Sequence, residues 1–365
     1  MPKLNAVDAI SPAFNLTRKN LFTPFRWGFW IRIAILGFFT GELSSGGGCN
    51  FNVPANWSNR RHDSFAAAAS APHFDPHLFL ALLPIIIAVA VVIGLVLLYV
   101  NSIFRFSLLE AILTGQISIR DSWSRWQRQG TRYFVFQLLL SLAMLVLVGT
   151  AALVVLAMVG LATFKQSGAA AASAVVTIMF AALIIFLLLL PFLLVQVLAK
   201  DFAAPVMALE GVGFGDAWRR VWNMVKGEFW SVAAYIGMKI VLRIAAGIAF
   251  GIAAVIVLII LAIPIGGLGV VAVLAGKAAG MTWSPATITL AVGVGILLVA
   301  FIIFVVAMIC APLAVFFPAY GLYFFAGRYQ PLHDRLFPPP PPAPPASEPP
   351  PVPPAPEPPP EFLPT

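Results

Sequence analysis

Two short stretches of the chain repeat the same acidic, aromatic and basic residues. Segment 119–128 reads IRDSWSRWQR, and segment 216–220 reads DAWRR. The alignment pairs Asp121, Trp123, Arg125 and Phe134 with Asp216, Trp218, Arg220 and Phe229. A carboxylate at a helix start stabilises the free backbone N–H groups there, indole prefers the membrane–water interface, and guanidinium binds phosphate. The repeated pattern therefore indicates contact with lipid headgroups.

The tryptophans of each stretch are spaced to share one face of a helix. Trp123 and Trp126 are three residues apart, and Trp218 and Trp222 are four apart, so each pair lies on one side of its helix. The arginines fall on another side. We expect two amphipathic helices lying in the membrane plane. The predicted lipid-interface residues are Trp123, Arg125, Trp126, Arg128, Trp218, Arg219, Arg220 and Trp222.

Other polar residues are candidates for proton transfer or metal binding, but structural roles explain them more simply. Glu110 and Glu210 would be candidates for proton transfer if they lay within the membrane, but we favour cytoplasmic helix extensions whose carboxylates lie in water or pair with an arginine. His73, Asp75 and His77 could ligate a metal, although they lie in a loop that contains a proline. No catalytic motif is recognisable. We predict no catalytic residue, no cofactor and no metal site.

The composition places these residues on a membrane protein. The chain has 365 residues, of which 61% are hydrophobic and 10% charged, and its formal net charge is +8. Soluble domains carry about 25% charged residues, and the mean hydropathy here is +0.96. The basic residues flank apolar segments, which favours anionic lipid over nucleic acid as the partner. The two cysteines, Cys49 and Cys310, indicate neither a disulfide framework nor a zinc site.

Six segments are long and apolar enough to be read as transmembrane helices. They are 24–43, 78–100, 134–161, 174–199, 230–262 and 288–316. We expect an all-α polytopic membrane protein with an N-terminal interfacial segment over 1–23 and a six-span membrane domain over 24–330. Segment 268–287 is read as a surface connection after a break at Pro264, with a seventh span as the alternative. Residues 331–365 are expected to form a proline-rich, disordered tail, because dense proline excludes helix and sheet.

The distribution of Lys and Arg predicts the orientation. If both termini and the connections 101–132 and 200–228 face the cytoplasm, nearly all of the 22 basic residues lie on that side. The exceptions are Arg60, Arg61, Lys165 and Lys277. This asymmetry follows the positive-inside rule. We expect a multi-pass protein of a bacterial inner membrane with cytoplasmic termini.

The two Trp-Arg stretches each precede a pair of predicted spans, which indicates a tandem repeat. A looser third copy precedes the first span, where Phe14 and Phe25 keep the spacing of Trp123 and Phe134. We predict three units, each an interfacial elbow helix followed by a hairpin of two spans. Parallel repeats of this kind are common in membrane proteins.

Short segments resemble uncharacterised bacterial inner-membrane proteins, grouped with the membrane domain of glycerophosphodiester phosphodiesterases and with YciC-like proteins. The segments are 24–26 (PFR), 46–51 (GGGCNF), 201–209 (DFAAPVMAL) and 217–219 (AWR). The resemblance covers roughly residues 10–330. The catalytic domain of that phosphodiesterase family is a separate soluble barrel, to which nothing here corresponds. The resemblance therefore implies an all-helical membrane module without an inherited active site.

These observations favour a non-enzymatic structural or accessory membrane module that binds anionic lipid. A transporter of a small solute or lipid is the first alternative, with Pro191 and Pro312 as predicted kinks. A lipid-processing enzyme is the second, and it would require Glu110, Glu210 and Arg125 to converge on one cavity. The proline-rich tail could bind a protein partner. The sequence does not predict an oligomeric state.

Overall fold

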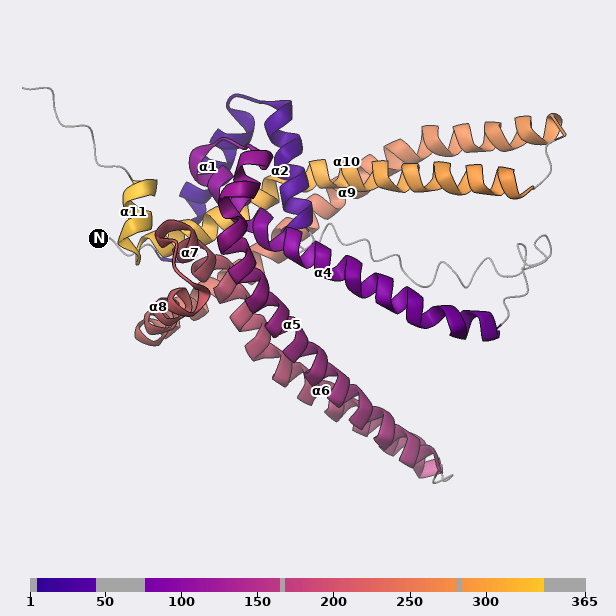
Figure 1. Cartoon of the computed structure of the whole chain (residues 1–365), viewed down its shortest axis with the longest axis horizontal. Helices are drawn as coiled ribbons and strands as arrows, with labels where there is room; N and C mark the ends of the chain where they lie inside the picture. Colours follow the sequence, from indigo (N-terminus) through magenta and orange to yellow (C-terminus); the bar gives the residue numbers. More distant parts are fainter. Residues whose placement is uncertain (1–4, 44–75, 165–167, 281–283, 338–365) are drawn as a thin grey trace, which may run out of the picture.

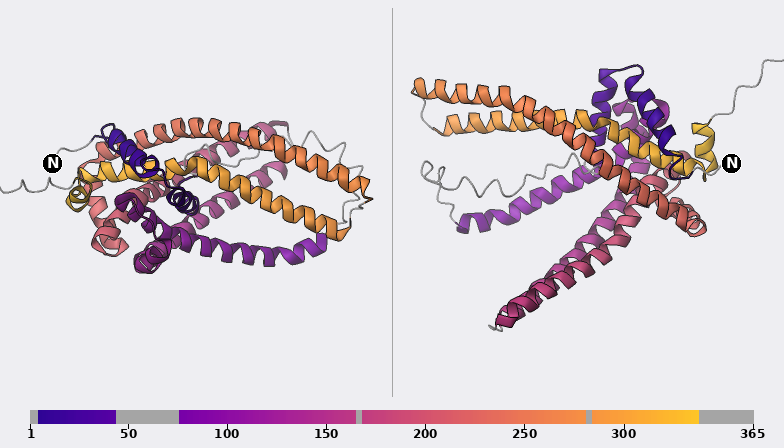
Figure 2. Two further views of the ribbon diagram at one scale, coloured as in Figure 1. Left: turned by 90° about the horizontal axis from the view of Figure 1, so that it is seen from above. Right: turned by 180° about the vertical axis from the view of Figure 1, so that it is seen from behind.

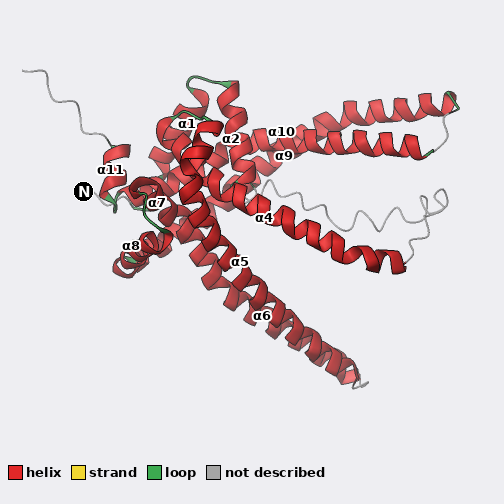
Figure 3. Cartoon of the chain, in the orientation of Figure 1, coloured by secondary structure: helices red, strands yellow, loops and turns green. Residues whose placement is uncertain are grey.

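A computed structural model describes residues 5–43, 76–164, 168–280 and 284–337 (Figure 1). Throughout these ranges the chain forms helices joined by short turns, and Figure 3 shows no strand in them. The predicted all-α class is confirmed. The bulk of the proline-rich segment and the loop with His73 and Asp75 lie outside the described residues.

Five long apolar helices dominate the structure. They are α4 (Pro76–Thr114), α5 (Ile119–Phe164), α6 (Gly168–Leu198), α9 (Phe229–Ala278) and α10 (Pro285–Ala326). Each contains a segment apolar enough to cross a membrane. The helices meet at one end, and from there α4, the α5–α6 hairpin and the α9–α10 hairpin diverge (Figures 1 and 2). We call the diverging parts the apolar arms.

The long helices exceed the length that a bilayer requires. At about 1.5 Å per residue, the 50 residues of α9 extend about 75 Å, whereas the hydrocarbon core is about 30 Å thick. Each long helix can therefore supply both an apolar arm and a part of the packed region. Side chains along the arms, such as Leu145, Ile259 and Leu297, are mostly exposed, as expected for a surface that faces lipid.

The predicted first span is wrong. The helix α2 (Trp27–Phe39) has 13 residues and extends only about 20 Å. It ends because the chain turns at Thr40, whose hydroxyl donates to the carbonyl of Leu36 at 2.8 Å, and at Gly41, whose φ is 69°. The described residues thus hold five candidate spans, and the first predicted two-span hairpin does not form.

The helix α2 packs across α10 instead of crossing the membrane. The indole N–H of Trp30 donates to the carbonyl of Met308 at 2.9 Å. A Cβ at Gly37 would lie 2.5 Å from the Cβ of Ala314, so this glycine permits the close crossing. The helix α1 (Ile10–Phe22) also packs on α10, and its buried face includes Ala13 and Leu21.

The two predicted elbow helices differ in the structure. The second is a separate amphipathic helix, α8 (Phe214–Gly227), which is separated from α9 at Glu228, where φ is −136° and ψ is 45°. The first is not separate, because residues 119–132 form the opening turns of the continuous helix α5. Gly130 does not break α5 but lets α4 approach, since a Cβ there would lie 2.7 Å from Cγ1 of Ile103.

Two helix ends support the internal repeat. The helices α4 and α7 (Ala204–Glu210) stop at Gly115 and Gly211, whose φ angles are 67° and 68°. Each glycine N–H donates to a carbonyl four residues earlier, at 2.9 Å and 3.0 Å. Left-handed glycine is a common helix terminator. The same stop precedes both Trp-Arg stretches, which supports an internal repeat of these two units.

Two further expectations require correction. Pro264 does not break the chain: α9 continues through it to Ala278, so 268–278 is neither a separate surface connection nor a seventh span. Cys310, buried in α10, forms a disulfide. The only other cysteine of the chain, Cys49, lies outside the described residues.

The core lies where the long helices converge. Its buried residues come mainly from α1, from 103–112, from 198–207 and from 306–326. Large side chains without exposed surface include Phe106, Phe202 and Tyr320. The short helix α11 (Gln330–Leu336) packs on α10 and buries Leu332, so the ordered chain extends beyond the boundary expected at 330.

Candidate functional site

Six charged side chains converge within the core, and we call this set the charged hub. Its members are Glu42, Arg105, Lys200, Asp201, Lys239 and Arg243. They come from the turn after α2, from α4, from the segment between α6 and α7, and from α9. The hub therefore joins four segments that are far apart in the sequence.

A π-helical turn supplies two members of the hub. The turn η3 (Ala199–Ala203) follows α6 directly and contains Lys200 and Asp201. A π turn inserts one extra residue per hydrogen-bonded ring and changes the direction of neighbouring side chains, and such turns are frequent at functional sites. Here Lys200 pairs with Glu42, while Asp201 pairs with Lys239.

Glu42 lies at the centre of three cations. Its carboxylate oxygens lie 3.3 Å from Nη1 of Arg105, 3.3 Å from Nζ of Lys200 and 3.9 Å from Nη2 of Arg243. Arg105 also donates from Nη2 to the carbonyl of Thr40 at 3.2 Å, which fixes the turn. Burial alone would raise the pKa of Glu42, but the surrounding positive charges outweigh it and hold this pKa well below its usual range.

Asp201 forms the second ionic group. It pairs with the ammonium group of Lys239 and accepts a hydrogen bond from the Tyr235 hydroxyl at 2.9 Å. The close approach of α10 to Tyr235 of α9 depends on Gly321, because a Cβ at this position would lie 2.9 Å from the Tyr235 hydroxyl oxygen. The ring of Tyr235 stacks on Tyr320 with centroids 5.2 Å apart. Asp201 is thus fixed by hydrogen bonds and by aromatic packing.

A small cavity adjoins the hub. Its volume is about 30 Å³, and Glu42, Arg105, Lys200 and Asp201 line it together with apolar residues of α4, α7 and α10. A cavity of this size holds about two water molecules. Both ionic groups of the hub therefore border the same cavity.

Two of the predicted lipid-interface tryptophans take part in internal packing. Trp126 donates its indole N–H to Glu110 at 2.6 Å and stacks on Phe106. Trp123 contacts Tyr99 and Phe104 edge to face. Both indoles are half-buried. Both indoles therefore pack α5 against α4, and only part of each ring is exposed.

The arginines near these tryptophans remain at the surface. Arg125 pairs with Glu110, and its side chain is 62% exposed. Arg128 is exposed as well. Of the two environments expected for the Glu110 carboxylate, water or an arginine, the structure shows the arginine.

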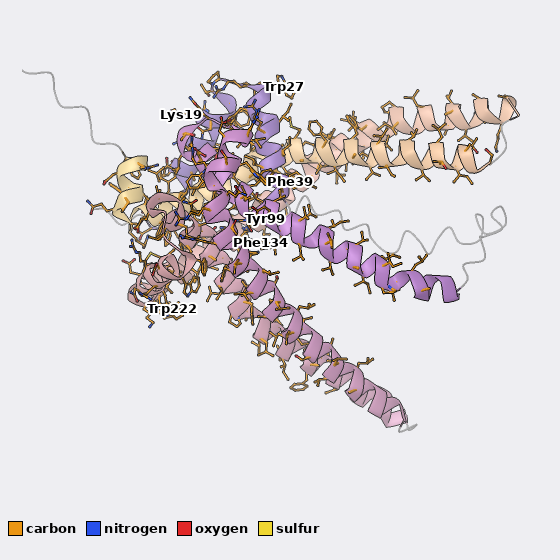
Figure 4. All side chains as sticks on the ribbon, in the orientation of Figure 1. Lys19, Trp27, Phe39, Tyr99, Phe134 and Trp222 are labelled. Atoms are coloured by element: carbon orange, nitrogen blue, oxygen red, sulfur yellow. The ribbon has the colours of Figure 1, made fainter. Side chains whose placement is uncertain are left out.

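The helix α8 presents the clearest outward surface among the predicted residues. Ala217, Val221 and Val225 form its buried face. Trp222 is 42% exposed, and Nζ of Lys226 lies 5.6 Å from its ring centroid. Figure 4 shows Trp222 at the outer margin of the packed region. Arg219 is exposed too.

The remaining residues near α8 pack within the helix or link it through Glu210 to Tyr329, which follows α10. Trp218 is half-buried between Phe214 and Trp222, with stacked rings on both sides. Glu210 pairs with Arg220 and accepts a hydrogen bond from Tyr329. Burial and the hydrogen bond to Glu210 raise the pKa of the Tyr329 hydroxyl. For Glu210 as well, the structure shows the arginine rather than water as the partner of the carboxylate.

Glu110, Glu210 and Arg125 do not line the cavity beside the hub, and the two carboxylates belong to separate ion pairs. Within the described ranges, no group of His, Cys, Asp or Glu could hold a metal ion. The proposed ligands His73 and Asp75 fall outside those ranges.

Sequence reasoning missed the charged hub. One signal was available: Lys239 and Arg243 are four residues apart in an otherwise apolar segment and therefore share a face of α9. Charged residues that share one face within an apolar helix usually meet partners inside a protein. No comparable spacing in the sequence indicated that Glu42 is buried among cations, because it lies in a turn.

Comparison with known proteins identifies a family but no characterised relative. No curated protein and no solved structure matches the chain. Nothing found supports the resemblance to the glycerophosphodiester phosphodiesterase membrane domain or to YciC-like proteins. A family model described as a family of unknown function, DUF7544, matches residues 4–334, which is most of the chain. The chain therefore belongs to the DUF7544 family.

Proposed function

We propose that the protein is a non-enzymatic, multispan module of a bacterial inner membrane, which binds anionic lipid at the cytoplasmic surface through α8. The observation that carries this proposal is the exposed face of α8. Arg219, Trp222 and Lys226 are exposed and are spaced by three and four residues, so they lie along one side of the helix. At about 100° per residue, that side is turned away from the buried face of Ala217, Val221 and Val225.

The chemistry of this face fits a headgroup layer. An exposed indole is stable at the membrane–water interface, where the ring is partly in the apolar zone. Cationic side chains near an anionic leaflet contribute about 1 kcal/mol each. Nζ of Lys226 lies near the ring of Trp222, so the indole and the ammonium group would meet the membrane at the same depth. The helix is thus suited to lie parallel to the membrane surface.

The position of α8 relative to the apolar arms supports this reading. The helix lies at the end where the long helices converge, away from the tips of the arms (Figure 1). If the arms cross the bilayer, α8 lies near one membrane surface. The positive-inside rule assigns that surface to the cytoplasm, because Lys277 lies at the far end of α9 and most other basic residues lie at the converging end.

The alternatives have weaker support. A lipid-processing enzyme would need its acidic and basic groups around one cavity, but Glu110 and Glu210 form separate surface pairs. A transporter needs a route for its solute, and the cavity beside the hub has a volume of about 30 Å³. The groove between α5 and α6 has a volume of about 500 Å³ but is lined almost entirely by apolar residues, as a site for a lipid chain would be.

The test is to measure lipid association after neutral substitutions on α8. Arg219→Gln and Lys226→Gln should each lower the amount of phosphatidylglycerol retained by the purified protein, measured by native mass spectrometry. Lys277→Gln is the matched control, because it removes one exposed positive charge at the far end of α9. Equal retention in all three variants would contradict the proposal.

A further inference from the structure

We propose that the charged hub binds a small inorganic anion of about the size of chloride in the cavity beside Arg105 and Lys200. The proposal concerns the interior of the protein and does not depend on the lipid contact of α8. It rests on three observations: the charge of the hub, its unpaired donors and the cavity itself.

The charges of the hub do not balance among the described residues. Four basic side chains face two carboxylates, so two positive charges are in excess. The four cationic side chains are between 5% and 24% exposed. An uncompensated charge in such surroundings is costly, and buried charges are normally paired. A bound anion would reduce the excess.

Buried hydrogen-bond donors in the hub and next to it also lack a partner among the described residues. Nε of Arg105, Nε of Arg243 and the hydroxyl of Tyr133 are buried and make no hydrogen bond within the described part of the chain. An unpaired buried donor costs about 1–3 kcal/mol. The guanidinium of Arg105 lies 6.0 Å from the ring centroid of Tyr133, and of these three side chains Arg105 is the one that lines the cavity.

The cavity provides space of the appropriate size. Arg105 and Lys200 both line it. Its volume of about 30 Å³ corresponds to about two water molecules, which suits a monatomic anion and excludes a nucleotide or a sugar phosphate. Glu42 and Asp201 also border the cavity, but each already faces cations: Lys239 for Asp201 and three side chains for Glu42. The carboxylates therefore do not cancel the excess positive charge.

Thermal unfolding of the full chain in detergent tests the proposal. The unfolding midpoint is measured while sodium gluconate is replaced by sodium chloride at constant ionic strength. Because a ligand that binds only the folded state stabilises it, the midpoint should rise with chloride and then saturate. Gluconate is too large for the cavity and serves as the reference anion. A midpoint that does not change with chloride overturns the proposal.

Two substitutions localise the effect. Lys200→Gln removes a cation that lines the cavity but leaves the pair of Glu42 with Arg105, and it should weaken chloride binding about tenfold or more, as expected for a lost charge-assisted hydrogen bond. Arg105→Lys keeps the charge and removes the unpaired Nε donor, so it should also weaken binding. Exposed Arg128 provides the control, Arg128→Gln. A chloride response in both hub variants equal to that of the control overturns the proposal.

Two further measurements distinguish misfolding of a variant and binding of a lipid phosphate from binding of chloride. If Lys200→Gln does not fold, as judged by helical circular dichroism, Arg105→Lys decides alone. If phosphatidylglycerol removes the chloride dependence and stabilises the protein in its place, the excess charge belongs to a lipid phosphate, and the proposal fails. Arg219→Gln on α8 should leave the chloride response unchanged. The proposed lipid contact of α8 and the proposed anion site can therefore fail independently.

Discussion

At the scale of single residues, Glu42 holds the hub together because it neutralises cations from three segments. Removing one partner of a buried ionic network leaves the others uncompensated, at a cost of about 3–5 kcal/mol. Glu42→Gln should therefore destabilise the protein by about this amount, measured by unfolding in mixed micelles with sodium dodecyl sulfate. The exposed Asp334 gives a charge-matched control, Asp334→Asn. A loss no greater than that of the control would show that Glu42 does not organise the hub.

The pH dependence of Glu42 follows from its lowered pKa. A depressed carboxyl pKa contributes stability that is present above the unfolded value and is lost as the pH falls through the folded value. The ordinary value is 4.5, and in the folded protein the pKa lies well below it. The stability difference between the wild type and Glu42→Gln should therefore be the same at pH 7 and pH 5. A difference that shrinks markedly at pH 5 would contradict this assignment.

Gly321 sets the distance between α10 and the pair of Tyr235 and Asp201. A Cβ at this position would force the Tyr235 oxygen to move, and overpacking of a dense core costs about 1–3 kcal/mol. Gly321→Ala should lower the free energy of unfolding by this amount. Gly237 lies in α9, and a Cβ added there would have no heavy atom within 4 Å, so Gly237→Ala should be neutral or stabilising. Equal effects of the two substitutions would exclude the packing explanation.

At the scale of elements, the sequence predicts what depends on local composition. The long spans in α4, α5, α6, α9 and α10 follow from apolar length alone. The repeated Trp-Arg stretches correctly mark the starts of α5 and α8. The early end of α2 and the π turn η3 depend on contacts with distant segments, such as the bond from Arg105 to Thr40. The charged hub could not be predicted because its members come from separate segments.

The left-handed glycines that end α4 and α7 provide a prediction for the repeat. An L-residue in this conformation costs about 1–2 kcal/mol, so Gly115→Ala and Gly211→Ala should each destabilise the protein by a similar amount. Gly215 lies in the first turn of α8 with open space around it, and Gly215→Ala is the control. Chemical denaturation in detergent measures all three. Unequal losses at Gly115 and Gly211 would argue against equivalent roles.

At the scale of the whole molecule, packing is concentrated at one end and apolar surface at the other. The buried residues gather where the helices converge, while the arms expose aliphatic side chains along their lengths. In water this surface would drive aggregation, whereas in a bilayer it contacts lipid. If the arms cross a bilayer, the hub and the exposed side of α8 lie near the same membrane face. The proposed contact of α8 with lipid headgroups requires this placement.

Cysteine labelling in intact bacterial cells tests that placement most directly. In a variant with Cys49→Ala and Cys310→Ala, single cysteines are introduced as Lys277→Cys at the far end of α9 and Arg219→Cys on α8. A membrane-impermeant maleimide should label the Lys277→Cys protein in intact cells and the Arg219→Cys protein only after permeabilisation. Labelling of the Arg219→Cys protein in intact cells, with the Lys277→Cys protein protected, would contradict the account.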